Sequence, residues 1–120
     1  MADEITIYQS LQVSNGALNW ARTSPQTKID QITLGGPSPG FLTIGTSEET
    51  VGLSEISTLG WCLIENLDDT NYVDFGFSTG VYGIRVKPDE FAMFRLTPGV
   101  TLYALANTAA CKVNVYVLES

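Results

Sequence analysis

The sequence predicts an all-β protein, a jelly-roll-like β-sandwich with an extended N-terminal hairpin or arm. Short apolar and aromatic runs recur along the chain with the two-residue side-chain period of strands, and turn-forming residues separate them. No stretch keeps a helical apolar period over the roughly 11 residues that would indicate a helix. About eight strands favour a double-sheet jelly roll, and a smaller Greek-key sandwich fits nearly as well.

The N-terminal segment has the pattern of a long strand followed by a hairpin. Apolar residues occupy odd positions at Ile5, Ile7, Leu11 and Val13. Asn15-Gly16 follows, which is a strong hairpin signal between alternating residues, and the segment after it can return antiparallel to the first strand. We therefore expect a strand and a returning partner before the main body of the protein.

The chain between this hairpin and the body is rich in turn formers. Residues 22–28 are polar and include Pro25, and residues 34–40 contain three glycines and two prolines. Two readings stay open, a hairpin packed on its own domain and an arm that reaches a neighbouring subunit. A chain of 120 residues fits one domain. We assign 1–40 to the arm or hairpin and its connection, and 41–120 to the sandwich body.

The body shows further strand-like runs in order. Lys87–Glu90 suits a type I turn because proline presets the second dihedral, and Pro98-Gly99 ends the next run similarly. Glu48-Glu49 is expected in a solvated loop, and Gly76 at a bulge or close backbone approach. The predicted strands are Phe41–Ile44, Val51–Leu53, Trp61–Ile64, Tyr72–Phe77, Tyr82–Val86, Phe91–Leu96 and Lys112–Val117.

Charge and hydropathy exclude several classes of partner. The formal net charge is −7, and the six lysines and arginines form no basic run, so we expect no nucleic-acid binding. No apolar stretch approaches the roughly 20 residues that span a bilayer, so we expect no membrane partner. The N-terminus lacks the pattern of a secretory signal, which predicts synthesis and folding in a cytoplasm. Cys62 and Cys111 lie in apolar runs and are expected as reduced core thiols.

The sequence offers little for catalysis. It contains no histidine and no CxxC spacing, which argues against most nucleophilic triads and against a metal site. An enzyme would have to rely on the carboxylates of Glu65, Asp68, Asp69 and Asp74. A turn in which short polar side chains bond to their own backbone is favoured over a calcium loop and over an acid/base pair. We therefore expect no enzymatic activity, no cofactor and no metal.

Most of the aromatic residues are expected to pack in the core or on strand faces, and Tyr116 is the exception. Tyr116 lies on the polar face of the last strand, beside Lys112 and Asn114, and tyrosine is enriched in protein interfaces. The N-terminal strand is a candidate arm that could add to a neighbour's sheet. The candidate interface residues are Ile5, Ile7, Tyr8, Leu11, Val13, Trp20, Phe41 and Tyr116.

The C-terminal half resembles a family. Residues 60–66 and 72–76, the Pro-Asp-Glu turn within 86–91, and the Leu-Tyr-Ala strand within 102–106 look like small virion structural proteins of tailed bacteriophages, with the capsid cement or decoration protein as the nearest type. The resemblance covers roughly residues 60 to 120. It rests on the order of a strand, an Asx-rich turn, a Pro-Asp-Glu turn and a Leu-Tyr-Ala strand, and not on a signature motif.

This resemblance implies a non-catalytic jelly-roll-like domain, present in many copies at the capsid surface after synthesis in the bacterial cytoplasm. It implies binding to the major capsid protein at subunit junctions of the lattice, as a homodimer or homotrimer. Phage tail, adaptor and fibre domains use similar sandwiches, so they stay open as alternatives. A carbohydrate-binding jelly-roll module is a further alternative.

Overall fold

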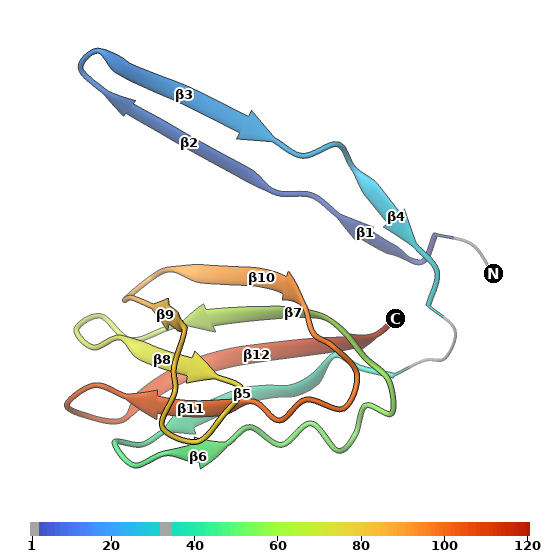
Figure 1. The fold of residues 1–120 in the computed structure, drawn as a ribbon, viewed down its shortest axis with the longest axis vertical. Helices are drawn as coiled ribbons and strands as arrows, with labels where there is room; N and C mark the ends of the chain where they lie inside the picture. Colours follow the sequence, from blue (N-terminus) through green and yellow to red (C-terminus); the bar gives the residue numbers. More distant parts are fainter. Residues whose placement is uncertain (1–2, 32–34) are drawn as a thin grey trace. The chain divides into compact units, whose positions relative to one another are not determined.

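The computed structural model describes residues 3–31 and 35–120 (Figure 1). The chain divides into two compact units, residues 1–32 and residues 33–120, and each is described by itself. The described residues form strands and turns and contain no helix, so the predicted all-β class is confirmed. The sequence placed the boundary between the two parts at residue 40, whereas the two units meet between residues 32 and 33. β5 (Ser38–Ile44) therefore belongs to the body.

The first unit consists of paired strands. β2 (Ser10–Asn15) pairs antiparallel with β3 (Leu18–Thr23), and β1 (Ile5–Ile7) pairs antiparallel with β4 (Thr27–Ile29). The hairpin predicted from the sequence is therefore confirmed. Its loop is Gly16-Ala17, one position later than the Asn-Gly pair.

Backbone angles identify the hairpin turn. Gly16 has a φ of 58°, whereas Ala17 is not among the residues with positive φ. A positive φ at only the first central position is the pattern of a type II′ turn, whose twist matches that of the paired strands. Glycine adopts this conformation without the steric cost of a Cβ atom.

The long N-terminal strand predicted from the sequence is two strands instead. The ladder breaks where Tyr8 lies opposite two residues, Pro25 and Gln26, between the register pairs of β1 with β4 and of β2 with β3. Proline has no N–H to donate and cannot continue a ladder. Backbone and side-chain bonds between Gln9 and Ser24, at 2.8 and 2.9 Å, resume the pairing beyond the break.

The second unit is a sandwich of two four-stranded antiparallel sheets. One sheet has the order β10-β7-β12-β5, and the other has the order β6-β11-β8-β9. Numbering β5 to β12 as 1 to 8 gives the orders 6-3-8-1 and 2-7-4-5, which is a double Greek-key jelly roll. The strands not yet bounded are β6 (Glu49–Thr50), β7 (Leu59–Asn66), β8 (Val73–Gly76), β9 (Ile84–Val86), β10 (Phe91–Arg95), β11 (Tyr103–Ala106) and β12 (Cys111–Glu119).

The core lies between the two sheets. In β12, Val113, Val115 and Val117 are fully buried and alternate with half-buried Asn114 and Tyr116, as the sequence predicted. Each large apolar side chain buried in this way contributes about 1.5–3 kcal/mol to folding. The larger partners of these valines in the core cluster include Ile44, Ile64, Phe75, Leu96 and Leu102.

Both cysteines are free thiols inside the sandwich. Cys62 lies in β7 and Cys111 in β12, and both side chains are buried. The prediction of reduced core thiols is confirmed. Burial raises the pKa of the Cys62 thiol to about 12.

One predicted strand is absent. Val51–Leu53 is outside the strands, and the pairing segment is Glu49–Thr50, where a solvated loop had been predicted at Glu49. Val51 and Leu53 are still buried, and the Val51 N–H donates to the carbonyl oxygen of Leu102 at 2.8 Å. This run is apolar because its side chains enter the core, although its backbone does not form a ladder.

Two predicted turns are correctly placed but differ in type. The Glu90 N–H donates to the Lys87 carbonyl oxygen at 3.0 Å, and Asp89 has a φ of 63°. A positive φ at the third position defines a type II turn, so the type I prediction is wrong. Pro88 fits either type, because it fixes only the second position. Gly99, with a φ of 87°, gives the next turn the same type.

Residues 38–40, which were predicted to belong to the turn-rich connection, form the start of β5 instead. β5 is an edge strand, where Pro39 is tolerated because no ladder partner needs its N–H. Leu34, in the turn-rich run, lies outside the described residues.

At Gly76, a Cβ atom would lie 2.0 Å from the carbonyl oxygen of Val81, which confirms the predicted close backbone approach.

Candidate interaction surface

The β2–β3 hairpin carries an apolar face. The register places Leu11 opposite Arg22, Val13 opposite Trp20 and Asn15 opposite Leu18. Directly opposed residues of an antiparallel pair project to the same side of the ribbon. Four large apolar side chains therefore share one face, which we call the ribbon face. Their exposed fractions are 69% for Leu11, 37% for Val13, 57% for Leu18 and 51% for Trp20.

The other face of the ribbon is polar. Ser10 and Thr23 share a hydrogen bond of 3.1 Å, and the Ser14 hydroxyl donates to Asn19 Oδ1 at 3.0 Å. Every residue of β2 and β3 is exposed. A two-stranded ribbon has no second layer of its own, and such ribbons are only marginally stable in water. The hairpin is therefore amphipathic and leaves its apolar face uncovered.

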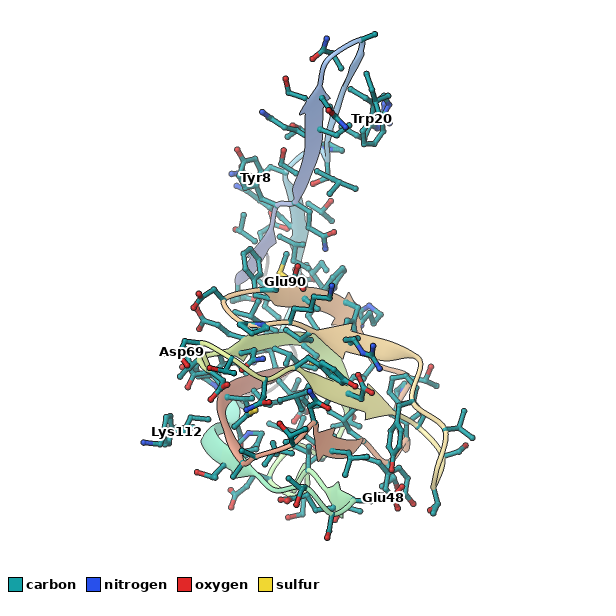
Figure 2. The ribbon with its side chains drawn as sticks, turned by 90° about the vertical axis from the view of Figure 1, so that its left-hand side faces the viewer. Tyr8, Trp20, Glu48, Asp69, Glu90 and Lys112 are labelled. Carbon is teal, nitrogen blue, oxygen red and sulfur yellow. The ribbon has the colours of Figure 1, made fainter. Side chains whose placement is uncertain are left out.

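The ribbon face is hollowed beside its tryptophan. An open hollow of about 340 Å³ is lined by residues that include Leu11, Trp20, Arg22 and Pro25. Figure 2 shows Trp20 nearer the hairpin turn and Tyr8 farther along the ribbon. The hollow has the size to receive a side chain, and the Arg22 guanidinium gives it a positive group.

A second apolar surface lies on the β10-β7-β12-β5 sheet. The register aligns Phe91, Glu65, Asn114 and Phe41 in one row across its four strands. The neighbouring valines of β12 point into the core, so this row faces outward. The next row on the same side is Met93, Leu63, Tyr116 and Pro39. We call these two rows the outer sheet face.

The outer sheet face is exposed at both edges. Phe41 is 60% exposed and Phe91 is 68% exposed, and the residues between them are half-buried. Asn114 Nδ2 donates to Glu65 Oε1 at 3.2 Å in the centre of the row. Antiparallel sheets with one wet face usually carry polar residues on it, so an apolar outer face indicates a covering partner.

The structure distributes the sequence-predicted interface residues over these surfaces. Leu11, Val13 and Trp20 share the ribbon face, and Tyr8, 63% exposed, lies at the break in the ladder. Phe41 and Tyr116 lie on the outer sheet face, in successive rows. Ile5 and Ile7 are buried, with only 7% of each residue exposed, and they belong to neither surface.

Sequence reasoning missed several members of these surfaces, among them Leu18, Phe91 and Met93. Leu18 had a usable signal, because it is the first residue after the hairpin loop and the register follows from the loop position. For Phe91 and Met93 the alternation within one strand does not tell which side faces the core.

The four carboxylates considered for catalysis are not brought together. Asp68 accepts hydrogen bonds from the backbone N–H groups of Asn71 at 2.6 Å and of Thr70 at 3.0 Å, which lower the pKa of this carboxyl group. The predicted turn is thus confirmed at Asp68. Asp74 is paired with Arg85 at 2.8 Å on the other sheet, whereas Glu65 lies on the outer sheet face. Among the described residues, no group of acidic or cysteine side chains could hold a metal ion.

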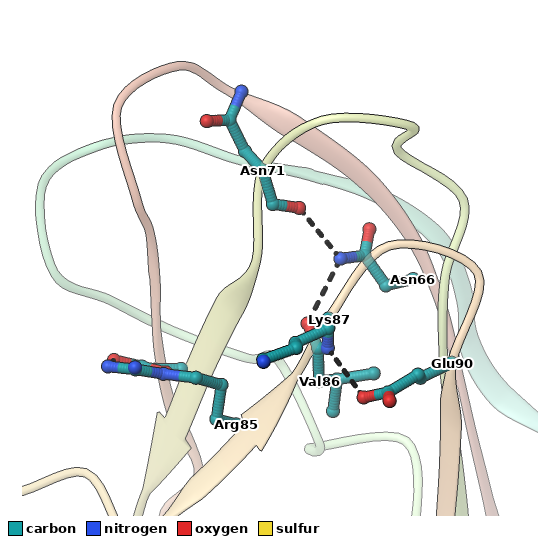
Figure 3. A network of polar contacts seen from close by, with 7 residues as sticks. Asn66, Asn71, Arg85, Val86, Lys87 and Glu90 are labelled. Atoms are coloured by element: carbon teal, nitrogen blue, oxygen red, sulfur yellow. Dashed lines mark hydrogen bonds and ion pairs between the residues drawn. The ribbon is translucent and has the colours of Figure 1, made fainter.

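A buried asparagine ties together the loops at one end of the sandwich (Figure 3). Asn66 is fully buried, and its Nδ2 donates to the carbonyl oxygens of Asn71 at 2.9 Å and of Val86 at 3.0 Å. Lys87 N–H donates to Glu90 Oε1 at 3.0 Å in the adjacent turn. These bonds hold the loops that flank Glu65 and Phe91, which positions one end of the outer sheet face.

The described residues include no helix with the length and apolar character needed to cross a membrane. Comparisons of the chain with family models, with curated proteins and with solved structures found no match.

Proposed function

We propose that this chain is a non-enzymatic virion structural protein that binds the capsid lattice at subunit junctions and stabilises the shell, as a cement or decoration protein does. The observation that carries the proposal is the uncovered ribbon face of Leu11, Val13, Leu18 and Trp20. An apolar face of this kind is useful to a protein whose working state is an assembly, because a neighbouring subunit then covers it.

The ribbon face supplies the binding free energy in this account. Burying each large apolar side chain contributes about 1.5–3 kcal/mol, and part of that gain offsets the loss of translational and rotational freedom on association. Trp20, next to the hollow, is the expected centre of the contact, because tryptophan dominates interface energetics more often than most residues. Arg22 adds a cation that selects a carboxylate on the capsid protein.

The ribbon also offers backbone hydrogen bonds. β2 and β3 form a two-stranded sheet, so each has an outer edge that pairs with no described strand. An extended segment of a capsid protein can add to such an edge, and main-chain bonds then contribute affinity with little demand on side-chain identity. Binding to the assembled shell but not to its separated subunits shifts the equilibrium towards the shell.

Cosedimentation with phage heads that lack the protein tests this proposal. The variant Leu11→Ser/Trp20→Ser removes two side chains from the ribbon face. We expect it to bind the heads at least about tenfold more weakly than the unchanged protein, since loss of a central apolar anchor costs 1.4 kcal/mol or more. Its thermal unfolding should change little, because both side chains are exposed.

The matched control is Gln12→Ser, on the polar face of the same ribbon. It changes an exposed residue of β2 without touching the apolar side, so head binding should stay unchanged. Equal binding by the ribbon-face variant and the control would contradict the assignment of the ribbon face to the capsid.

A further inference from the structure

The outer sheet face is the second uncovered apolar surface, and the ribbon-based function does not use it. We propose that it binds a second copy of this chain face to face, about a two-fold axis that runs parallel to the strands between β7 and β12. The inference extends the proposed function, because it names a second partner for the same protein.

The apolar content of the face favours a protein partner. Its two rows contain two exposed phenylalanines, Phe41 and Phe91, and the half-buried side chains of Leu63, Met93 and Tyr116. Aromatic residues and methionine are enriched in protein interfaces. The outward side of the other sheet is different, because there Arg85 bonds to Asp74 and stacks on the Tyr72 ring, 3.8 Å from its centroid.

The order of residues in each row is self-complementary. The row reads Phe91, Glu65, Asn114, Phe41 across β10, β7, β12 and β5. A two-fold axis between β7 and β12 reverses this order in the second copy. Each Phe91 then faces Phe41 of the second copy, and each Glu65 faces Asn114 of the second copy. Reciprocal contacts of this kind are what a closed dimer interface requires.

The charges on the face fit the same arrangement. Asn114 Nδ2 already donates one hydrogen bond to Glu65 of its own chain, and an amide nitrogen has a second hydrogen to donate. The axis brings this second donor towards Glu65 of the other copy. Lys112 is exposed and lies one row further along β12, so the axis also brings its ammonium group beside the other copy's Glu65. The buried carboxylate is therefore satisfied by hydrogen bonds and by a cation.

The size of the face fits a small stable interface. Four strands spaced about 4.8 Å apart, with lengths near seven residues, give a plane of roughly 19 by 23 Å. Side-chain relief raises the accessible area of such a plane above its projected area. A specific interface needs roughly 500 Å² on each partner, so a plane of roughly 440 Å² with side-chain relief and flanking loops is of the right order for a small one.

Sedimentation equilibrium of the full chain without heads tests the inference. We expect a concentration-dependent monomer–dimer equilibrium for the unchanged protein. Phe41→Lys should weaken the dimer by about tenfold or more, since it places a charge in an apolar contact. The matched control is Phe77→Lys, which changes another exposed phenylalanine, 45% exposed, just after β8 in the other sheet. It should leave the dimer unchanged.

A charge exchange tests the register. Asn114→Glu alone sets a carboxylate opposite Glu65 of the other copy and should weaken the dimer by roughly tenfold. Adding Glu65→Asn restores a Glu–Asn pair in the opposite sense, and the double variant should return to within about threefold of the original affinity. Thermal unfolding of each variant shows that a loss of dimer is not a loss of fold.

Three results would overturn the inference: a monomer at all concentrations, a double variant no better than Asn114→Glu, or a dimer broken by Trp20→Ser but not by Phe41→Lys. A monomer at all concentrations would show that the outer sheet face does not bind a second copy. The third result would assign the dimer to the ribbon face. These measurements use no heads, so their failure is distinct from a failure of the proposed capsid binding.

Discussion

Asn66 Nδ2 lies 3.0 Å from the carbonyl oxygen of Val86 and donates a hydrogen bond to it, across 20 residues of chain. The same nitrogen donates to Asn71, and Asn66 Oδ1 accepts from the Asp68 N–H at 2.9 Å. One fully buried amide thus donates to two backbone carbonyl groups and accepts from one backbone N–H group.

Replacing this amide should destabilise the sandwich strongly. Asn66→Ala removes all three of these hydrogen bonds, and we expect a loss of about 2–4 kcal/mol in the free energy of unfolding, measured by urea denaturation. The control is Asn107→Ala, at an exposed asparagine, which should cost less than about 0.5 kcal/mol. Equal losses for the two variants would show that the Asn66 bonds do not hold these loops.

Gly76 is expected to reject any side chain. A Cβ atom there would lie 2.0 Å from the Val81 carbonyl oxygen and 2.9 Å from Tyr82 Cα, both of them backbone atoms that cannot swing away. Gly76→Ala should lower the free energy of unfolding by about 2 kcal/mol or more, because the strand has to shift. Gly52→Ala serves as the comparison, since a Cβ atom there meets nothing within 4 Å and the backbone of Gly52 does not have a positive φ. A harmless Gly76→Ala would contradict the close approach.

Acid should weaken the contact between two loops of the sandwich. The Tyr82 hydroxyl and then the Gly80 N–H donate to Glu48, and these bonds lower the pKa of Glu48 below its ordinary 4.5. The carboxylate form is therefore favoured in the folded protein. Its contribution to stability is present above pH 4.5 and is lost as the pH falls through the folded pKa.

Thermal unfolding of Glu48→Gln against the unchanged protein checks this expectation. The variant should melt lower at pH 7, and the difference should close as the pH is lowered past 4.5. Tyr82→Phe removes the main donor, so it should reproduce most of the effect, and the double variant should add little to it. A difference that stays constant with pH would count against the Glu48–Tyr82 bond.

The thiols should be unreactive until the protein unfolds. Burial raises the pKa of Cys62 to about 12, so at pH 8 only about one molecule in ten thousand carries the reactive thiolate. Cys111 is buried as well, with its pKa raised by the same cause. Ellman's reagent should label no thiol in the native protein and two in denaturant without reductant. Fewer than two in denaturant would indicate a disulfide.

The parts of the fold with strict local patterns were predictable from the sequence. β12 was predictable because its valines alternate with polar residues over the six positions from Lys112 to Val117, and it pairs with a strand on each side. The hairpin was predictable because Gly16 permits the tight turn that joins β2 to β3. Val51–Leu53 misled the prediction, since a three-residue apolar run does not reveal whether its backbone pairs.

The candidate surfaces were predictable only in part. Leu11, Val13 and Trp20 could be named, because alternation around the Asn-Gly signal places them on one side of a ribbon. The row from Phe91 to Phe41 could not be predicted, because it depends on the register between strands whose paired residues, such as Phe41 and Asn114, lie up to 73 residues apart in the chain. Alternation within a strand fixes its two faces but does not fix which residue it meets on the next strand.

Counting the copies bound to purified heads tests the central claim most directly. Heads that lack the protein are saturated with it and sedimented, and its amount is measured against the major capsid protein. The account predicts hundreds of copies in a fixed ratio to the capsid protein, the order expected when each symmetric junction is one site. Binding of a few copies, or of none, would contradict a role as cement and would favour a tail or adaptor part.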